Sequence, residues 1–512
     1  MTDGQAQEIR EGSSMAGIGL RVALAICVFA CLMLLYGFRY PIHHDLAGSV
    51  LSGRLVVELG SAYRDYSIYF PPAERVWYSI AARLSDLIGL RLDLTIVAMT
   101  GVMALTSAEF AYRIRQATVG ATPRFLVLSV ALLVILPILF KNVFGLREHL
   151  IALGLWPYLV LRVSDPDGTK IGWRTRAVLG LWMGLTLLAK YLYSVVVLLV
   201  ELADAAIQRR PRLLFRTENI AAGGIVALYL FSWLVLDASQ RTAIGAMFSA
   251  IDANLADPVA NAWRVVENLC YAAAFLLLLH YFKVPWRLVA IGLAALIGTI
   301  IVAWSQERWY THHLFPIVLA YVAWWWMAGS YFRWWGHALV AIALAYPLLG
   351  QFLSTFQYRE QIVEVDQAIR EAGRSVDGKR VGILTMHPSP YNQYLASHGA
   401  IRWNTLMNNA YVAAELQPFD KPENAGKVPP PVKLDDPGRR LLHDQMIRLW
   451  QDKPPEVLIL DHSYRWPLHF IDVDWVHEFS GDPRFNAILS HYRPVLTHKG
   501  KRTSFTYYVR AD

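Results

Sequence analysis

Carboxylates and cations recur in the segments that separate the apolar runs of this 512-residue chain. Asp45 follows the first apolar run closely, and Glu148 lies in a very short segment between two later runs. A carboxylate can act as a general base toward a hydroxyl or an amine. Lysine and arginine can neutralise the charge that grows on a departing phosphate. The cations of these segments are Arg64, Lys141, Arg147, Lys190 and Arg308. Such a set suits the transfer of a group from a phosphate to an acceptor.

Histidines and tyrosines accompany these charges. The candidate substrate or metal contacts are His43, His44, His149, His312, His313, Tyr63 and Tyr191. Imidazole and carboxylate together are sufficient ligands for a divalent metal ion, so the histidines with Asp45 or Glu148 could bind one. Hydrogen-bonded histidines at a membrane interface, without a metal, are the alternative.

Each charged candidate also has a structural explanation. Asp45 could cap the helix that follows it, because Asp is favoured at that position. Glu148 could form a structural ion pair with Arg147 or Lys141, and Lys190 could extend its ammonium group to the membrane surface. Arg64 and Asp65 could form an ordinary solvated pair. The residues alone leave these alternatives open.

The apolar runs must position these side chains. A helix needs roughly 20 apolar residues to cross a bilayer about 30 Å thick, because its backbone polar groups must be satisfied internally. About eleven spans are predicted, at residues 16–37, 92–112, 124–141, 149–163, 175–189, 191–207, 218–236, 263–282, 287–304, 313–330 and 335–354. The chain is therefore predicted to be an α-helical polytopic membrane protein.

The charge balance divides the chain near residue 355. Only 17% of the residues are charged, against about 25% in soluble domains. The first 354 residues hold 28 basic and 21 acidic residues, whereas the remainder, from Thr355, holds 20 and 19. This composition excludes a disordered or collagen-like chain. No basic cluster is interleaved with aromatic residues, so nucleic acid is not an expected partner.

The predicted orientation follows from the basic residues of the short loops. The first span has no small-residue cleavage site, so we interpret it as a retained helix with a cytoplasmic N-terminus. Arg162, Arg176, Arg216 and Arg287 then belong to the basic cytoplasmic segments, as the positive-inside rule requires. An odd number of spans places the C-terminal domain outside, in a periplasm-like compartment.

Residues 356–512 are predicted to form an α/β domain. Residues 380–386 and 456–461 are short apolar runs typical of buried parallel strands. Helical periodicity covers residues 357–374 and 438–451, and residues 493–510 resemble a hairpin that turns at Gly500. A proline-rich loop is predicted at residues 417–437. We predict two domains: residues 1–355 in the membrane, with interfacial helices in an outer loop at 38–91, and residues 356–512 outside.

The order of these motifs resembles the GT-C superfamily of polyprenyl-phosphate-dependent glycosyltransferases, which includes protein mannosyltransferases and the lipid A aminoarabinose transferase. The resemblance covers about residues 16–355. It rests on an acidic residue soon after the first span, the pattern from Gly60 to Pro72, Glu148 in the short second outer loop, the Lys190-Tyr191 pair and the His-rich turn before a late span. Many members have paired acidic residues where this chain has His43-His44-Asp45.

The resemblance implies roles for individual residues. Asp45 would be the single catalytic base, and Glu148 the second acidic residue. Arg64, Arg147 and Lys190 would face the phosphate of the donor lipid, with Lys141 and Arg308 as further phosphate contacts. The one candidate cofactor, a divalent metal ion, rests on the histidine and carboxylate donors named above and not on this resemblance.

The function expected from this resemblance is inverting transfer of a sugar from a polyprenyl-phosphate donor to a lipid, glycan or protein acceptor in the cell envelope. The enzyme would act at the outer face of a bacterial inner membrane. A transporter or flippase of a lipid-linked glycan is one alternative, and a non-catalytic envelope scaffold is another.

Overall fold

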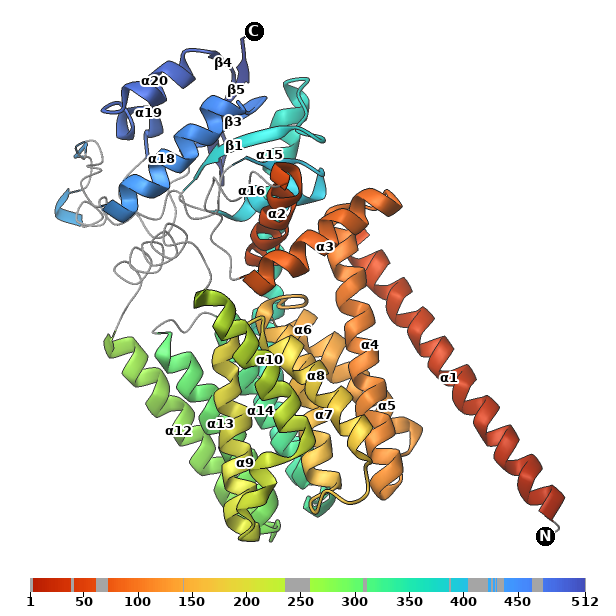
Figure 1. The fold of residues 1–512 in the computed structure, drawn as a ribbon. Helices are drawn as coiled ribbons and strands as arrows, with labels where there is room; N and C mark the ends of the chain where they lie inside the picture. The colour runs from red at the N-terminus through yellow and green to blue at the C-terminus, as the bar shows by residue number, and fades with distance from the viewer. Residues whose placement is uncertain are drawn as a thin grey trace. The chain divides into compact units, whose positions relative to one another are not determined.

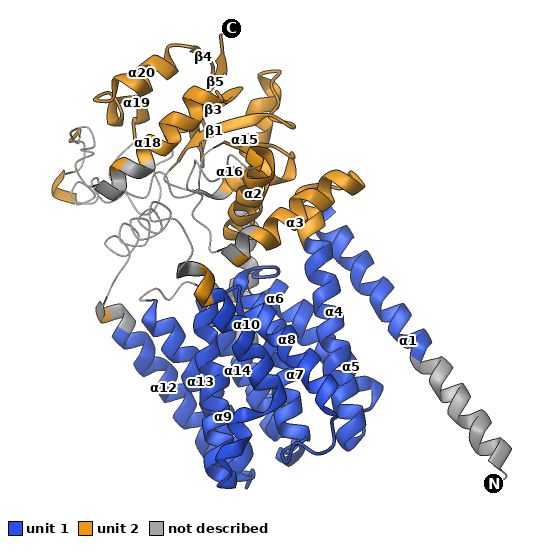
Figure 2. Ribbon diagram, viewed as in Figure 1, with its two compact units in different colours: residues 1–40, 97–229, 262–353 blue, residues 41–96, 230–261, 354–512 orange. Residues whose placement is uncertain are grey.

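The fold was analysed in a computed structural model (Figure 1). The structure describes residues 3–37, 41–60, 72–140, 142–234, 258–306, 311–385, 388–403, 437–462 and 473–511, together with 422–424, 427–428 and 430. These residues form two compact units (Figure 2). Unit 1 comprises residues 1–40, 97–229 and 262–353, and unit 2 comprises residues 41–96, 230–261 and 354–512.

Unit 1 is a bundle of helices from which the long first helix, α1, slants away (Figure 1). Its elements are α1 (Asp3–Gly37), α4 (Leu92–Val119, which begins in unit 2), α5 (Pro123–Val130), the π-helical turn η2 (Ala131–Ile135), α6 (Leu136–Leu139), α7 (Arg147–Ser164), α8 (Trp173–Leu187), α9 (Ser194–Gln208), α10 (Thr217–Leu234), α12 (Pro258–Tyr281), α13 (Trp286–Ser305), α14 (Thr311–Ala328) and the first part of α15 (Trp334–Glu371). Each predicted span coincides with one of these helices or with the continuous run α5–η2–α6. The prediction of a polytopic helical fold is therefore confirmed.

Six of the described helical segments are long and apolar enough to cross a membrane. They are 18–37, 92–119, 191–208, 262–281, 286–305 and 313–331. Residues 123–139 and 334–343 form shorter apolar helices. The total of about eleven spans remains a prediction.

The end of unit 1 at which α7 ends and α8 begins contains a cluster of buried charges. We call it the buried ionic cluster, and its members are Arg162, Asp165, Arg176, Glu201, Asp204, Arg216, Glu218 and Arg287. They come from the ends of α7, α8, α9, α10 and α13 and from the turns beside them. The four cations and four anions balance one another, so burial leaves no net charge in the apolar bundle.

Arg162 is at the centre of the buried ionic cluster. Its side chain has no solvent exposure, and its guanidinium donates to the carboxylates of Glu201 and Glu218. Arg176 donates to the same Glu218 oxygen over 2.7 Å. At the other side of the cluster, Arg287 donates to Asp204 over 2.8 Å. The pairs thus join successive helix ends to one another through side chains.

Unit 2 contains α2 (His44–Leu59), α3 (Pro72–Ile88), the end of α15 and a five-stranded sheet. The strands are β1 (Arg380–Leu384), β2 (Ile401–Arg402), β3 (Val457–Asp461), β4 (Tyr492–Lys499) and β5 (Ser504–Arg510), in the order β2-β1-β3-β5-β4. Strand β1 is parallel to both β2 and β3, and β5 is antiparallel to β3 and β4. The helices beside the sheet are α16 (Pro388–Ser397), α18 (Pro437–Asp452), α19 (Trp475–Glu478) and α20 (Pro483–Leu489).

The predicted α/β domain is confirmed in its main elements. Both apolar runs are parallel neighbouring strands, and the final hairpin turns at Gly500 as predicted. The predicted helix at residues 357–374 is not separate from the last span, because α15 continues from Trp334 to Glu371. Residues 351–371 contain neither glycine nor proline, so nothing in that stretch ends the helix. Most of the predicted loop at 417–437 lies outside the described residues.

The two helices of the predicted outer loop differ in their surroundings. Most residues of α2 are buried, because α2 packs against α3, α16 and β2. At the crossing with α3, a Cβ atom on Gly53 would lie 2.4 Å from the backbone of Tyr78, so only glycine permits this approach. Helix α3 instead exposes the apolar side chains Val76, Ile80 and Leu87. Of the two helices, α3 therefore has the exposed apolar face expected of an interfacial helix.

The stability of the C-terminal sheet region is expected to decrease in acid. Burial lowers the pKa of His443 below its ordinary 6.5, in spite of its hydrogen bond to Asp482. Burial raises the pKa of Asp482, but hydrogen bonds from Arg484 and His443 outweigh this and hold it below 3.8. For both groups the unfolded chain binds more protons than the folded chain as the pH falls. Stability is thus expected to be complete above about pH 7, and to decrease below about 6.5 and again below about 4. Thermal unfolding of the full chain between pH 8 and 4 measures this dependence of stability on pH. The Asp482→Asn variant should lose the decrease in stability that begins below about pH 4. An unfolding midpoint that does not change with pH would contradict the prediction.

Candidate functional site

A buried carboxylate–ammonium pair lies at the end of unit 1 opposite the buried ionic cluster. Glu148 is in the first turn of α7 and is 1% exposed. The Lys190 Nζ atom lies 2.7 Å from Glu148 Oε1, and His313 Nε2 lies 3.9 Å from the same oxygen. The start of a helix favours a negative charge, because the helix dipole presents its positive end there. Three residues that the sequence predicted for the site, from three different helical hairpins, are thus brought together.

The interruption between α8 and α9 positions Lys190. Helix α8 ends at Leu187, and Lys190 adopts φ −160° and ψ 83°, which lie outside the helical region. A 3₁₀ turn at Tyr191–Tyr193 then leads into α9. The side chain of Lys190 can therefore point across the end of the bundle toward α7 rather than along its own helix.

The turn before α7 is fixed by His149. The backbone N–H of Gly145 donates to His149 Nδ1 over 3.0 Å, and His149 Nε2 lies 2.7 Å from the Leu133 carbonyl oxygen in η2. Because Nδ1 accepts a hydrogen bond, the ring proton is on Nε2, and Nε2 donates a hydrogen bond to the Leu133 carbonyl oxygen. Both ring nitrogens are engaged by the backbone, so this predicted candidate holds the N-terminus of α7 in place next to Glu148.

The ion pair between Glu148 and Lys190 predicts strong energetic coupling. Lys190→Met removes the ammonium group that is bonded to the buried carboxylate, whereas Glu148→Gln together with Lys190→Met removes both charges of the pair. We expect a coupling free energy of about 1–3 kcal/mol in a double-mutant cycle. Denaturant unfolding of the four proteins measures it. Purely additive effects would show that the pair does not form in solution.

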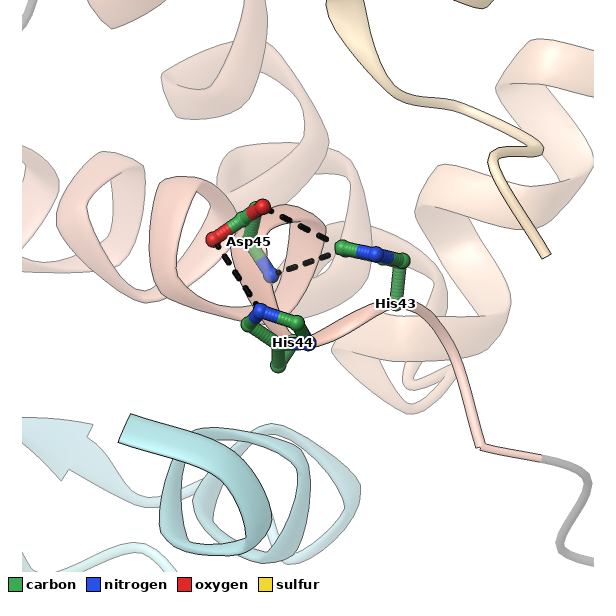
Figure 3. A group of neighbouring side chains, drawn as sticks. All are labelled: His43, His44 and Asp45. Atoms are coloured by element: carbon green, nitrogen blue, oxygen red, sulfur yellow. Dashed lines mark hydrogen bonds and ion pairs between the residues drawn. The ribbon is translucent and has the colours of Figure 1, made fainter. Parts of the chain in front are cut away.

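A second group of side chains lies in unit 2 at the start of α2 (Figure 3). Asp45 Oδ2 lies 3.6 Å from His43 Nδ1, and Asp45 Oδ1 lies 3.5 Å from His44 Nε2. The two imidazole rings stack, with their centroids 4.2 Å apart. His43 Nδ1 also accepts the Asp45 backbone N–H over 3.2 Å, so His43 rather than Asp45 caps α2. The capping explanation for Asp45 is therefore wrong, and its carboxylate faces the two imidazoles instead.

The His43-His44-Asp45 group also fits a divalent cation. One ligand atom from each residue lies within 4.8 Å of the others, and two imidazoles with one carboxylate are a common donor set for zinc and for other transition metals. His43 is buried and the other two side chains are partly exposed, so a bound ion would keep a position open to solvent or substrate. The metal ion remains a candidate cofactor on this donor set.

Other predicted candidates have different positions. Arg147 is in the first turn of α7 and half-buried, and the ring of Tyr191 lies 6.1 Å from that of Tyr229. His312 lies in α14, but its side chain is outside the described residues. The remaining predicted candidates outside the description are Tyr63, Arg64, Lys141 and Arg308.

The sequence prediction missed Tyr193. This side chain is buried without solvent exposure at the end of the 3₁₀ turn that follows Lys190. Its spacing of three residues from Lys190 was the available signal, because residues three apart lie on one side of a tight helical turn.

Comparison with known proteins gives a structural match but no sequence match. No protein-family model matches the chain, and no curated protein sequence matches it. The apo crystal structure of ArnT from Cupriavidus metallidurans matches with a TM-score of 0.51 and 12% identity, over 97% of this chain and 98% of ArnT. The ArnT structure bound to undecaprenyl phosphate gives a TM-score of 0.48 and 12% identity, over 96% and 98% of the two chains.

The match to apo ArnT extends from the helix bundle to the C-terminal sheet. At this identity it establishes the fold and leaves the activity to be argued from the residues. The chain therefore has the fold of ArnT, which agrees with the resemblance in its sequence.

Proposed function

We propose that the protein is an integral membrane glycosyltransferase that transfers a sugar from a polyprenyl-phosphate carrier to a cell-envelope acceptor. The observation that carries this proposal is the buried Glu148–Lys190 pair at one end of a GT-C-like bundle. An ammonium group held there by a carboxylate suits a phosphate that gains charge as the sugar departs. The motif order of the sequence supports the same class.

Glu148 has a positioning role in this proposal. Its carboxylate accepts a hydrogen bond from the Lys190 ammonium group and directs that group across the end of the bundle. The ammonium group can donate three hydrogen bonds, so it can contact a phosphate oxygen while it remains bonded to Glu148. Arg147, the residue before Glu148, adds a second cation for the same anion.

Asp45 is proposed as the general base. Its carboxylate would take the proton from the acceptor hydroxyl or amine as that group attacks the anomeric carbon. The bond from this carbon to the phosphate oxygen breaks, and the electron pair leaves with the phosphate. A single displacement of this kind inverts the anomeric centre. In this scheme His44, whose Nε2 lies 3.5 Å from Asp45 Oδ1, orients the carboxylate, and His43 holds the Asp45 backbone.

The proposed place of action is the outer face of a bacterial inner membrane, with a periplasmic C-terminal domain. Supporting it are the helices apolar enough to cross a bilayer and the basic residues of the predicted cytoplasmic loops. The acceptor is proposed to be a lipid, a glycan or a protein of the envelope.

A reconstituted assay tests the proposal. Purified protein in vesicles is supplied with a panel of radiolabelled sugars on undecaprenyl phosphate and with envelope extract as acceptor. Label transferred to the extract supports a glycosyltransferase. Label that crosses the bilayer without leaving its lipid supports a flippase and contradicts the proposal. If the label is neither transferred nor moved across the bilayer, the result supports a non-catalytic scaffold and also contradicts the proposal.

A further inference from the structure

Tyr193 carries a buried hydroxyl group that has no hydrogen-bond partner among the described residues. Its side chain has no solvent exposure, and its oxygen has no partner within the described part of the chain. Tyrosine hydroxyls that are buried usually find one. A buried polar group without a partner is unfavourable, so its retention calls for an explanation.

The position of Tyr193 directs this hydroxyl toward the site. Its backbone N–H donates to the Lys190 carbonyl oxygen over 3.0 Å, which closes the 3₁₀ turn. This hydrogen bond fixes the backbone of Tyr193 beside that of Lys190 at the break between α8 and α9. The charges of Glu148 and Arg147 both act on the Tyr193 hydroxyl, which places it in the electrostatic field of the ion pair.

The chemistry of the neighbouring groups identifies the missing partner. A phenol is protonated at neutral pH, because its ordinary pKa is about 10, so it can donate a hydrogen bond. It therefore needs an acceptor, and Glu148 does not serve as one. The charges of Arg147 and Glu148 act on it, and the Lys190 ammonium group lies 2.7 Å from that carboxylate, so cationic side chains belong to its surroundings. An anion rich in acceptor oxygens satisfies both the charge and the hydroxyl.

We propose that Tyr193 is a further substrate-binding residue, whose hydroxyl donates a hydrogen bond to a phosphate oxygen of the polyprenyl-phosphate carrier beside Lys190. This inference rests on the proposed function and names the group that recognises the carrier's phosphate. A water molecule bonded to the hydroxyl is the competing explanation, and it predicts no effect on lipid binding.

The Tyr193→Phe variant tests this inference without changing the shape of the side chain. Binding of undecaprenyl phosphate and of undecaprenol, which has the same tail and no phosphate, is measured by native mass spectrometry. The wild type should prefer the phosphate lipid. A hydrogen bond to a charged group corresponds to roughly tenfold or more in affinity, so the variant should lose at least that much of the preference. Its thermal midpoint should be unchanged or higher, because the unbonded hydroxyl is gone.

Tyr158→Phe is the matched control. The Tyr158 hydroxyl is also buried, but it donates to Glu201 over 2.8 Å in the buried ionic cluster. Its loss should lower the thermal midpoint and leave the lipid preference unchanged. If the wild type shows no preference for the phosphate lipid, the proposed function is wrong. If the wild type shows it and Tyr193→Phe retains it in full, only the role of Tyr193 is overturned.

Discussion

Asp45→Asn is expected to reduce sugar transfer by roughly 10²–10⁴-fold, the range contributed by a positioned general base. Asparagine has nearly the same shape but cannot accept the acceptor's proton. The reduction should appear in kcat, with little change in binding of the donor lipid, because the donor's phosphate is assigned to other residues. Initial rates with saturating donor measure it.

Glu58→Gln is the matched control for Asp45→Asn. Glu58 lies on the same helix α2 and pairs with Arg54 over 3.3 Å. Neutralising it removes one acidic charge from the same helix without touching the histidines. It should leave transfer within a few-fold of the wild type. Full transfer by Asp45→Asn would contradict the assignment of the base.

Arg162→Ala is expected to destabilise the protein by about 3–5 kcal/mol, the cost of removing one partner from a buried ionic pair. The reason is that Glu201 and Glu218 would stay buried and lose the guanidinium that joins them. Denaturant or thermal unfolding in a detergent that maintains the wild-type fold measures the change.

An exposed arginine of the same region provides the comparison. Arg210 pairs with Asp167 over 2.9 Å, and both side chains are 59% exposed. Arg210→Ala should cost less than about 1 kcal/mol, because water and salt screen an exposed pair. Equal losses for Arg162→Ala and Arg210→Ala would show that the cluster is not buried in solution.

The fold was largely predictable because its main signals are local. A run of apolar residues long enough to span a bilayer forms a helix wherever it occurs, and β1 and β3 are apolar runs of the length of buried strands. The burial of α2 was not predictable, because it depends on α16, which follows more than 300 residues later in the sequence. The continuity of α15 was missed because the predicted span ends where the apolar residues end, near residue 354. The helix itself continues to Glu371.

The sequence predicted which residue types belong to the candidate site, but not which of their side chains contact one another. The sequence indicated that Glu148 and Lys190 belong to the same face of the membrane, since both follow or precede spans on that side. It did not indicate their 2.7 Å contact, because the contact depends on how α7 packs against the α8–α9 break. The histidine pair beside Asp45 was identified as a group, because three consecutive residues cannot lie far apart.

The acidic residues of the buried ionic cluster were not predicted from the sequence, for a different reason. The positive-inside rule found Arg162, Arg176, Arg216 and Arg287, because it counts basic residues in short loops. Glu201, Asp204 and Glu218 lie within predicted spans, where a sequence window averages them with many apolar neighbours. Their pairing with the arginines is a property of the assembled bundle.

The buried ionic cluster also affects how freely the helices of the bundle can tilt relative to one another. Ion pairs fasten α7, α8, α9, α10 and α13 to one another near one end. Glu148 and Lys190 lie at the opposite end, where their ion pair joins α7 to the break between α8 and α9. Because the tilt of a helix displaces most the end farther from its fixed point, a small tilt that leaves the buried ionic cluster intact changes the space around this pair.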